Sequence, residues 1–389
     1  MLQILDSTLR EGEQTPGVYF DSHIKVAIAD LLDQAGINII EAGHPLVTKD
    51  IFRAVKQLAN RKLKALVGAH SRSLEKDVDQ ALECGVQFLG IFYCVAEDRL
   101  NHVFKKDLNK AIDQIAKVIR YAREKDPDLL IRYTPEDTVR SEFQNVIDAA
   151  AAAIQAGADI ISVADTTGYM IPGTKRSMYD FVSRLKNELA KQNLQPKIAV
   201  HCHNDRGFAL ANAIDGFRAG AEIIDASILG LGERAGIVDL AQLIITLTID
   251  FEQQGRWNPQ VLSELYTLVS KYSGIPIPAH FPVMGANAFT HCAGVHTHAA
   301  LINPVHYQSV DPKILGKKMN VSLDHMSGLS SIEWALEQLE IKYDNALAER
   351  VLALVKSIGQ KGRSVDFTEL RHIVEWCITE HKNGESLDL

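Results

Sequence analysis

The 389-residue sequence has little of what several classes of protein require. Its five cysteines are odd in number and scattered, without a C-x-x-C spacing. This argues against a disulfide framework and a cysteine-ligated zinc site, and indicates a reducing compartment. No apolar run is long enough to span a bilayer, and a net charge of -8 gives no basic field for nucleic acid. The sequence therefore predicts no membrane partner and no nucleic-acid partner.

The N-terminal segment, MLQILDSTLRE, also lacks the basic and then apolar pattern of a secretory signal, so we expect a cytoplasmic protein. Apolar residues make up 46% of the chain and charged residues 23%, which is typical of a globular protein without extended disorder. The length suffices for one large domain and a smaller appendage.

Eight short apolar runs alternate with amphipathic stretches in the first two thirds of the chain. The stretches have helical apolar spacing, and several end at an Ala-Gly or Cys-Gly step. Such a rhythm predicts an α/β fold, a (β/α)8 TIM barrel, with a doubly wound sheet as the alternative. The expected strands are 2–5, 37–42, 63–68, 86–93, 129–133, 160–164, 197–200 and 222–226. The expected helices are 22–35, 74–84, 107–124, 141–156, 174–191 and 207–219.

A barrel should carry its chemistry at the C-terminal ends of the strands. Ordinary solvent-facing loops would explain one polar strand end, but seven together favour a site. These ends hold Asp6 and Arg10, Glu41 and His44, His70 and Arg72, Arg132 with Glu136 and Asp137, Asp165 with Thr166, His201 and His203, and the turn 230–236.

A proline-rich segment, residues 274–282, interrupts the rhythm and predicts a domain boundary. We expect a TIM-barrel catalytic domain over residues 1–273, a linker over 274–282 and a mostly helical region over 283–389, with helices near 331–339, 345–359 and 366–381. Because this region has little periodic apolar sequence, we expect no large core of its own and packing against the barrel or a second subunit.

Two segments far apart in the sequence together predict a divalent-metal site. His201 and His203 are two residues apart and directly follow the expected strand 197–200, so in extended backbone their side chains would project to the same face. With a carboxylate from Asp6 or Glu11 they would give three ligands and open positions, as a catalytic metal requires. An isolated H-x-H pair is as often a hydrogen-bonded or surface pair, so the prediction depends on the first strand.

Four segments carry a family resemblance over residues 2 to about 380: DSTLREGEQ at 6–14, HCHND at 201–205, GLGERAG at 230–236 and THCAGVH at 290–296. The chain resembles the metal-dependent TIM-barrel acyltransferases that perform Claisen condensations, which include homocitrate, isopropylmalate and citramalate synthases. No long regulatory domain follows, which favours the homocitrate synthase branch.

The resemblance implies condensation of acetyl-CoA with a 2-oxo acid, most closely 2-oxoglutarate to give homocitrate, in lysine biosynthesis. It implies Glu11, His201 and His203 as ligands of a divalent metal, which could be Zn, Mn, Co or Mg, and leaves Asp6 as a rival or an orienting group. By the same resemblance, Arg10 neutralises the developing alkoxide and Gln14 binds substrate. It also implies a homodimer.

The resemblance assigns the base that deprotonates acetyl-CoA to His296, working with Glu136, and places this histidine in the site of a neighbouring subunit. His296 could instead be a hydrogen-bonded interface histidine. Glu136 could instead stabilise the N-terminus of the following helix. Tyr307 is a weaker candidate for proton transfer, because a packed aromatic is the simpler interpretation.

The choice of 2-oxo acid depends on the pocket. By resemblance, Arg132 and His70 contact the distal carboxylate of 2-oxoglutarate, and Thr134 and Thr166 add hydrogen bonds. A buried arginine facing an isopropyl group would be an unpaired charge, which argues for a dicarboxylate. Ile237 agrees with the homocitrate branch, whereas the segment 42–45, AGHP, is closer to the branched-chain pattern.

Other functions stay open. Isopropylmalate, citramalate and Re-type citrate synthases would use the same metal and another 2-oxo acid. A hydroxymethylglutaryl-CoA lyase would need a catalytic cysteine in a glycine-rich loop, and Cys292 has a different context. A non-catalytic metal-binding relative would be expected to lack Arg10 or His296, and both are present.

Overall fold

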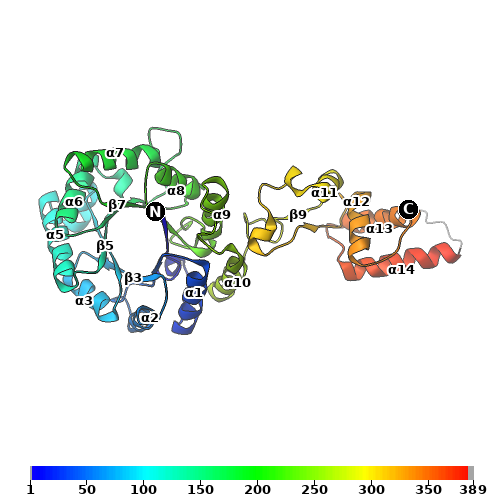
Figure 1. The fold of residues 1–389 in the computed structure, drawn as a ribbon, viewed down its shortest axis with the longest axis horizontal. Helices are drawn as coiled ribbons and strands as arrows, with labels where there is room; N and C mark the ends of the chain where they lie inside the picture. Colours follow the sequence, from blue (N-terminus) through cyan, green and yellow to red (C-terminus); the bar gives the residue numbers. More distant parts are fainter. Residues whose placement is uncertain (1, 384–389) are drawn as a thin grey trace. The chain divides into compact units, whose positions relative to one another are not determined.

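The computed structural model describes residues 2–383, and the chain divides into two compact units, Met1–Ile277 and Pro278–Leu389. The first unit is a closed barrel of parallel strands in the order β1 to β8, completed by pairing of β1 with β8 (Figure 1). The predicted TIM barrel is confirmed. Its strands are β1 (Gln3–Asp6), β2 (Ile39–Glu41), β3 (Leu66–Arg72), β4 (Phe88–Cys94), β5 (Leu130–Glu136), β6 (Ile160–Asp165), β7 (Lys197–Cys202) and β8 (Ile223–Ala226).

The helices lie outside the strands and ring the barrel (Figure 1). Six of them match predicted stretches: α1 (Ser22–Ala35), α3 (Glu75–Cys84), α5 (Leu108–Lys125), α6 (Phe143–Gln155), α7 (Met178–Lys191) and α8 (Ala209–Arg218). The sequence prediction missed α2 (Lys49–Ala59), α9 (Leu240–Asp250), α10 (Leu262–Ser273) and the short α4 (Glu97–Arg99). Short turns are η1 (Gly12–Gln14), η2 (Leu100–Phe104), η3 (Thr138–Arg140), η4 (Ile228–Gly230) and η5 (Pro259–Val261).

An apolar layer fills the barrel interior towards the N-terminal ends of the strands, with one side chain from each strand. These side chains are Leu5, Ile39, Leu66, Phe88, Leu130, Ile160, Ala199 and Ile223. Because side chains in a strand alternate between its faces, the residue two positions further along each strand faces the same interior. That second layer consists of Ser7, Glu41, Gly68, Gly90, Arg132, Ser162, His201 and Asp225. The barrel thus changes from a sealed apolar layer to a charged one towards the C-terminal ends of its strands.

The second unit has an apolar core of its own, although its sequence predicted no large one. The helices α12 (Leu329–Gln338), α13 (Asn345–Gly359) and α14 (Phe367–Asn383) supply most of the core, which includes Ile332, Leu336, Val351, Val355 and Leu370. The remaining elements are β9 (Thr290–His291), which pairs in parallel with β10 (Asn320–Val321), helix α11 (Gly294–Ile302), and the turns η6 (Pro304–His306) and η7 (Pro312–Leu315).

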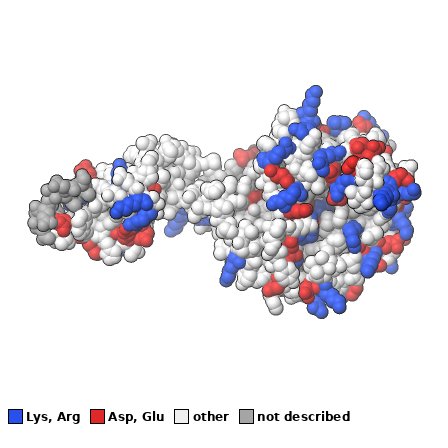
Figure 2. Space-filling view, turned by 180° about the vertical axis from the view of Figure 1, so that it is seen from behind, with Lys and Arg blue, Asp and Glu red and all other residues white. Residues whose placement is uncertain are grey.

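Charges of both signs are interspersed over the barrel surface seen in Figure 2, in keeping with the small net charge of -8. Among the described residues, no helix is both long and apolar enough to cross a membrane.

Candidate functional site

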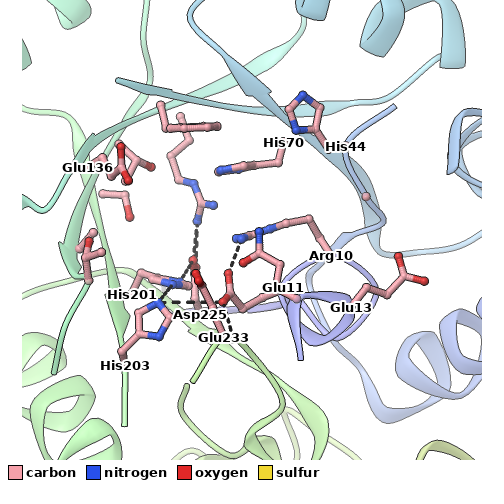
Figure 3. A pocket seen from close by; sticks show the side chains of 18 of the residues that line it. Arg10, Glu11, Glu13, His44, His70, Glu136, His201, His203, Asp225 and Glu233 are labelled. Atoms are coloured by element: carbon pink, nitrogen blue, oxygen red, sulfur yellow. Dashed lines mark hydrogen bonds and ion pairs between the residues drawn. The ribbon is translucent and has the colours of Figure 1, made fainter. Parts of the chain in front are cut away.

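A cavity of about 460 Å³ opens where the strands of the barrel end (Figure 3). All the site residues predicted in the first unit line it, together with the second-layer residues Ser162 and Asp225. Those predicted residues are Arg10, Glu11, Gln14, His70, Arg132, Thr134, Glu136, Thr166, His201 and His203. The structure therefore gathers side chains from widely separated parts of the chain around one space, as the barrel topology requires.

Glu11, His201 and His203 point towards one another at one side of the cavity (Figure 3). Each offers a ligand atom, and these atoms all lie within 4.8 Å of one another. The Nε2 atoms of the two imidazoles are 3.3 Å apart, and the Nε2 atom of His203 is 4.0 Å from Oε1 of Glu11. The three residues are the expected ligand set for a catalytic divalent cation.

The protonation of these groups suits a cation. Burial alone would raise the pKa of Glu11, but Arg10 and the two imidazoles outweigh it and hold the pKa at about 2. Burial lowers the pKa of His203 to about 4, so its ring is neutral at neutral pH. The carboxylate is therefore charged and His203 uncharged, which are the forms that bind metals.

Asp225 orients the first imidazole. Its Oδ2 atom lies 3.0 Å from Nδ1 of His201, so the ring donates its Nδ1–H to this carboxylate and directs the Nε2 lone pair at His203. At 3.3 Å from the Nε2 atom of His203, this lone pair is placed so that one cation could take both Nε2 atoms as ligands. A carboxylate behind a ligating histidine is a common arrangement in metal sites, and the residues present therefore fit a divalent cation.

Asp6, the rival for the metal, does not join this cluster. It is fully buried and does not line the cavity, and its carboxylate accepts hydrogen bonds from the backbone N–H and hydroxyl of Thr8. Burial raises the pKa of Asp6 to about 7. It stabilises the turn after β1, from which Arg10 and Glu11 project.

Glu41 is the central acceptor of the second layer. Its buried carboxylate accepts from Ser7 Oγ at 2.7 Å and from Arg10 Nε at 2.6 Å, and lies 3.1 Å from both Nδ1 of His70 and Nη2 of Arg132. Burial would raise the pKa of Glu41, but Arg10, His70 and Arg132 outweigh it and hold the pKa well below its ordinary value. Arg10 thus lies between Glu41 and Glu11, its guanidinium bonded to both.

Arg132 is almost fully buried, and its charge is not unpaired. Its Nη1 atom is 2.9 Å from both carboxylate oxygens of Asp225, and Nη2 donates to Glu41. The argument that an apolar substrate would leave this arginine without a counter-charge is therefore wrong, since two carboxylates of the barrel already neutralise it. This arginine alone does not select a dicarboxylate.

Three buried polar groups around Arg132 nevertheless have no partner in the described part of the chain: Arg132 Nε, Thr134 Oγ1 and Ser162 Oγ. The register of β5 and β6 pairs Arg132 with Ile160 and Tyr133 with Ile161, so the next step sets Thr134 beside Ser162. Buried polar atoms are rarely left unpaired in native proteins. All three belong to residues that line the cavity, so a polar ligand there would satisfy them.

The turn 230–236 closes the metal side of the cavity. The backbone N–H of Glu233 donates to Oε1 of Glu11 at 3.2 Å. Gly236 has a φ of 75°, and a Cβ atom there would lie 1.7 Å from the carbonyl oxygen of Gly230. Glycine is therefore required at this position for the turn to fold back and reach Glu11.

Gln14 also contacts the metal side of the site. Rotating its side-chain amide so that the nitrogen faces Glu11 places that nitrogen 3.0 Å from both carboxylate oxygens of Glu11.

The two predicted acid–base residues, Glu136 and His296, lie in different units of the structure. Glu136, at the end of β5, forms an ion pair with Arg99 at 3.0 Å on the cavity rim. Thr166, which was predicted to bind substrate, accepts the backbone N–H of Asp137 at 3.0 Å through its hydroxyl. His296 belongs to α11 in the second unit, where its ring lies 4.3 Å from that of Tyr307 between centroids. His296 is not among the residues that line the barrel cavity.

Sequence reasoning missed three residues that organise the site: Asp225, Ser162 and the buried Lys25 of α1. It recorded Glu41 only as a polar strand end. A usable signal existed for Asp225, because a carboxylate inside the apolar run of β8 is a buried charge that needs a partner. No comparable signal marked Ser162, since a serine in a strand has no fixed meaning.

Comparison with protein families matches both parts of the chain. Residues 1–269 match the HMGL-like family, and residues 283–363 match the family described as homocitrate synthase post-HMGL domain-like.

Several named relatives align over most of their length. The chain is 41% identical to homocitrate synthase of Pyrococcus horikoshii, with 91% of this chain and 94% of the relative aligned. It is 38% identical to homocitrate synthase AksA of Methanocaldococcus jannaschii, over 96% and 90%. It is 34% identical to the probable 2-isopropylmalate synthase of Ignicoccus hospitalis, over 99% and 94%.

Solved structures show the same barrel. The HMG-CoA lyase of Bacillus subtilis superposes with a TM-score of 0.61 at 20% identity, over 72% of this chain and 96% of the lyase. The carboxyl transferase domain of Rhizobium etli pyruvate carboxylase superposes with a TM-score of 0.52 at 17% identity, over 70% and 48%. At these identities the likeness shows the fold alone. The family models and the named relatives together show that the chain belongs to the HMGL-like family, in the group that contains homocitrate and isopropylmalate synthases.

Proposed function

We propose that this member of the HMGL-like family condenses acetyl-CoA with 2-oxoglutarate to give homocitrate and CoA, with a divalent metal ion. The observation that carries the proposal is the cluster of Glu11, His201 and His203 with Arg10 bonded to Glu11, at the edge of a cavity with unpaired polar groups deeper inside. Relatives that bear the name homocitrate synthase, at 41% and 38% identity, support it.

In this proposal Glu11, His201 and His203 hold the divalent cation, and Asp225 keeps His201 in the correct tautomer. Such a cation would act as a Lewis acid towards the 2-oxo carbonyl. Two imidazoles and a carboxylate suit Zn, Mn, Co or Mg, so the metal available in the cell would decide which one is bound. Arg10, held by Glu41 and Glu11, places a fixed positive charge where negative charge develops on the former keto oxygen. Gln14 binds substrate from the adjacent turn.

His296 is the proposed base, assisted by Glu136. The imidazole removes a proton from the methyl group of acetyl-CoA, and the resulting enolate carbon forms a bond to the keto carbon of 2-oxoglutarate. The keto oxygen becomes an alkoxide, which Arg10 stabilises until it takes up a proton. Water then cleaves the thioester and releases the CoA thiol and a new carboxylate. Because His296 belongs to the second unit, we also propose that the enzyme is a homodimer in which this histidine serves the partner's cavity.

The unpaired groups in the cavity support a substrate with a polar distal end. A distal carboxylate would accept hydrogen bonds from Arg132 Nε, Thr134 and Ser162, with His70 and Thr166 at the cavity wall. An isopropyl group would leave these donors unsatisfied, at a cost of about 1 to 3 kcal/mol for each buried polar group. The distal pocket therefore favours a dicarboxylate through hydrogen bonds rather than through a free arginine charge.

A 2-isopropylmalate synthase is the second candidate function. Val47 and Ile51 line part of the cavity and offer an apolar wall that a branched 2-oxo acid could contact. The relative from Ignicoccus hospitalis bears that name at 34% identity. Citramalate and Re-type citrate synthases would need a different fit to the same donors. Burial raises the pKa of Cys292, so its thiol lacks the activation that a lyase cysteine needs.

A thiol-release assay tests the proposed function. Purified protein with acetyl-CoA receives 2-oxoglutarate, oxaloacetate, 2-oxoisovalerate or pyruvate, each before and after removal of divalent metal by a chelator. We expect release mainly with 2-oxoglutarate, lost on metal removal and restored by an added cation. Release only with 2-oxoisovalerate or pyruvate would transfer the assignment to the second candidate class. If none of the four acids leads to CoA release, the protein is not a condensing enzyme for these substrates. Placement in lysine biosynthesis in the cytoplasm is part of the same proposal.

A further inference from the structure

Lys25 of α1 is a buried lysine that the proposed chemistry does not use. Only 1% of its surface is exposed, although it lies on a helix whose outer face is in solvent. Lysine is almost never fully buried unless it is paired. Its three ammonium donors are all engaged, with Glu13 Oε2 at 2.7 Å, the Leu9 carbonyl at 2.9 Å and the Ala42 carbonyl at 3.2 Å.

The three acceptors belong to three different parts of the site. Leu9 immediately precedes Arg10 and Glu11. Ala42 immediately follows Glu41, the acceptor that holds Arg10. Glu13, labelled in Figure 3, belongs to the turn η1, which also carries Gln14. Its carboxylate also accepts the backbone N–H of Phe20. One ammonium thus joins the loop after β1, the end of β2 and the turn between them.

Burial of this charge is unfavourable, and Glu13 is its only charged partner among the described residues. A buried ion pair is poor evidence for a contribution to stability, because apolar residues of similar size often replace one without loss. Positioning explains the arrangement better. Arg10 and Glu11 have to keep their distances to Glu41 and to the imidazoles, and two of the three acceptors are backbone carbonyls beside those residues.

We propose that Lys25 is a positioning residue that fixes the loop carrying Arg10 and Glu11 against the end of β2, and so sets the geometry of the metal ligands and of the guanidinium. This inference rests on the proposed function for its effect on turnover. Its effect on cation affinity is independent of which reaction the protein catalyses.

The test compares Lys25→Met with Lys186→Met. Lys186 on α7 also anchors a helix to a backbone carbonyl, that of Gly220 at 2.8 Å. Gly220 lies just before β8, at the N-terminal end of the strand, and so at the end of the barrel away from the cavity. Both variants lose a lysine-to-carbonyl contact, and only one loses it at the site. Melting temperature, affinity for Mn²⁺ alone by calorimetry, and kcat and KM for CoA release are measured on the full-length proteins.

We expect Lys25→Met to lower Mn²⁺ affinity and kcat by about tenfold or more each, as is typical when the support of a metal ligand is removed, with a smaller change in the KM for acetyl-CoA. Lys186→Met should stay within about twofold of the wild type in both, even where its melting temperature falls as far. A folded Lys25→Met protein with wild-type Mn²⁺ affinity and kcat would overturn the proposal.

Glu13→Gln provides the second variant, in case Lys25→Met does not fold. It keeps both carbonyl contacts of Lys25 and removes only the ionic anchor. We expect a smaller loss, about threefold, in Mn²⁺ affinity and in kcat. Unchanged values for both would count against the proposal. If the wild type releases no CoA with any 2-oxo acid, the proposed function fails, and the Mn²⁺ affinities alone still decide the part played by Lys25.

Discussion

Each charged side chain of the site touches a group of opposite charge, and those contacts hold it in place. Arg10 lies between Glu11 and Glu41, and Arg132 lies between Glu41 and Asp225. Such pairs are costly to break singly, because removal of one partner leaves the other buried without a counter-charge. Single substitutions in this network should therefore act on the neighbouring ligand as well as on the residue changed.

Asp225→Asn tests this coupling at the metal site. The substitution keeps the shape of the side chain but removes the charge that receives the Nδ1–H of His201 at 3.0 Å. We expect the affinity for a divalent cation, measured by calorimetry, to fall by about 10- to 100-fold. Asp239→Asn is the matched control, because Asp239 is also buried but accepts from the Tyr266 hydroxyl at 2.8 Å, outside the cavity lining. Equal losses in the two variants would contradict the orienting role of Asp225.

Ser162→Ala tests the distal pocket. Loss of the unpaired hydroxyl should lower kcat/KM for 2-oxoglutarate by about fivefold to tenfold, the effect of one hydrogen bond, and leave 2-oxoisovalerate unaffected or improved. Ser331→Ala is the control, since that serine is also fully buried and its hydroxyl has no partner among residues 2–383, but it does not line the cavity. A variant that loses efficiency equally with both acids would indicate a structural effect of Ser162.

The sequence located ten of the residues that line the cavity, but not how their charged groups pair. His201 and His203 could be predicted to share a face from the strand period, and the structure brings both to Glu11. The counter-charges of Arg132 could not, because Asp225 lies 93 residues away and only barrel closure brings the two together. The selectivity argument built on a free arginine failed for that reason.

At the scale of the strand, the barrel separates an apolar layer from a charged one within two residues, as from Ile39 to Glu41 in β2. On β1, Asp6 follows Leu5 on the opposite face of the strand and is a fully buried carboxyl group. Desolvation of Asp6 raises its pKa from 3.8 to about 7. The charged form of this side chain therefore opposes folding.

Asp6→Asn should remove a pH dependence of stability. The folded protein holds the Asp6 proton up to about pH 7, whereas the unfolded chain releases it near 3.8, so this group makes the folded state less stable as pH rises between those values. The difference in unfolding free energy between variant and wild type should increase by about 2.6 kcal/mol from pH 5 to pH 8, in favour of the variant. Urea unfolding at both pH values measures the gain. A difference between variant and wild type that is the same at both would show that Asp6 does not titrate as its burial requires.

Elements were predictable where their periodicity was strong. The predicted helix 22–35 coincides with α1, which begins after the Asp21 cap and ends at Gly36 with a φ of 85°. The prediction missed α9, whose sequence LAQLIITLTID is apolar on nearly all sides and so gives no amphipathic signal. Strand ends were predicted too early, because polar residues such as Glu136 and His201 continue β5 and β7 beyond their apolar runs.

At the scale of the whole molecule, the proposed chemistry needs both units. The cavity and the metal ligands belong to the barrel, whereas His296 belongs to α11 of the second unit. A separation of this kind predicts that binding and turnover can be dissociated by substitutions in different units. The sequence could place the boundary at a proline-rich segment, but it could not show that the second unit encloses an apolar core built from three helices.

His296→Ala should dissociate the two functions. We expect unchanged affinity for a divalent cation and a kcat for CoA release lower by about 100-fold or more, the usual contribution of a general base. His298→Ala is the control on the same helix, where the His298 ring contacts the Ser330 hydroxyl at 3.0 Å. Its kcat should stay close to that of the wild type. Comparable losses in the two variants would assign His296 a structural function.

Subunit exchange then tests whether the histidine acts across a dimer. Mixtures of His296→Ala and Arg10→Ala subunits should regain CoA release that neither parent shows, because one cavity of each mixed dimer would hold both intact groups. If activity stays at the parental level after exchange has been demonstrated, the base serves its own barrel.

Formation of the new carbon–carbon bond is the most direct test of the proposed reaction. Acetyl-CoA labelled with ¹³C in its methyl group is incubated with 2-oxoglutarate, a divalent cation and the protein, and the products are followed by NMR. We predict that the labelled methyl signal converts to the methylene signal of homocitrate at the rate of CoA release. Labelled acetate with no methylene signal would show that the protein only hydrolyses the thioester, and would contradict the assignment of the site to a Claisen condensation.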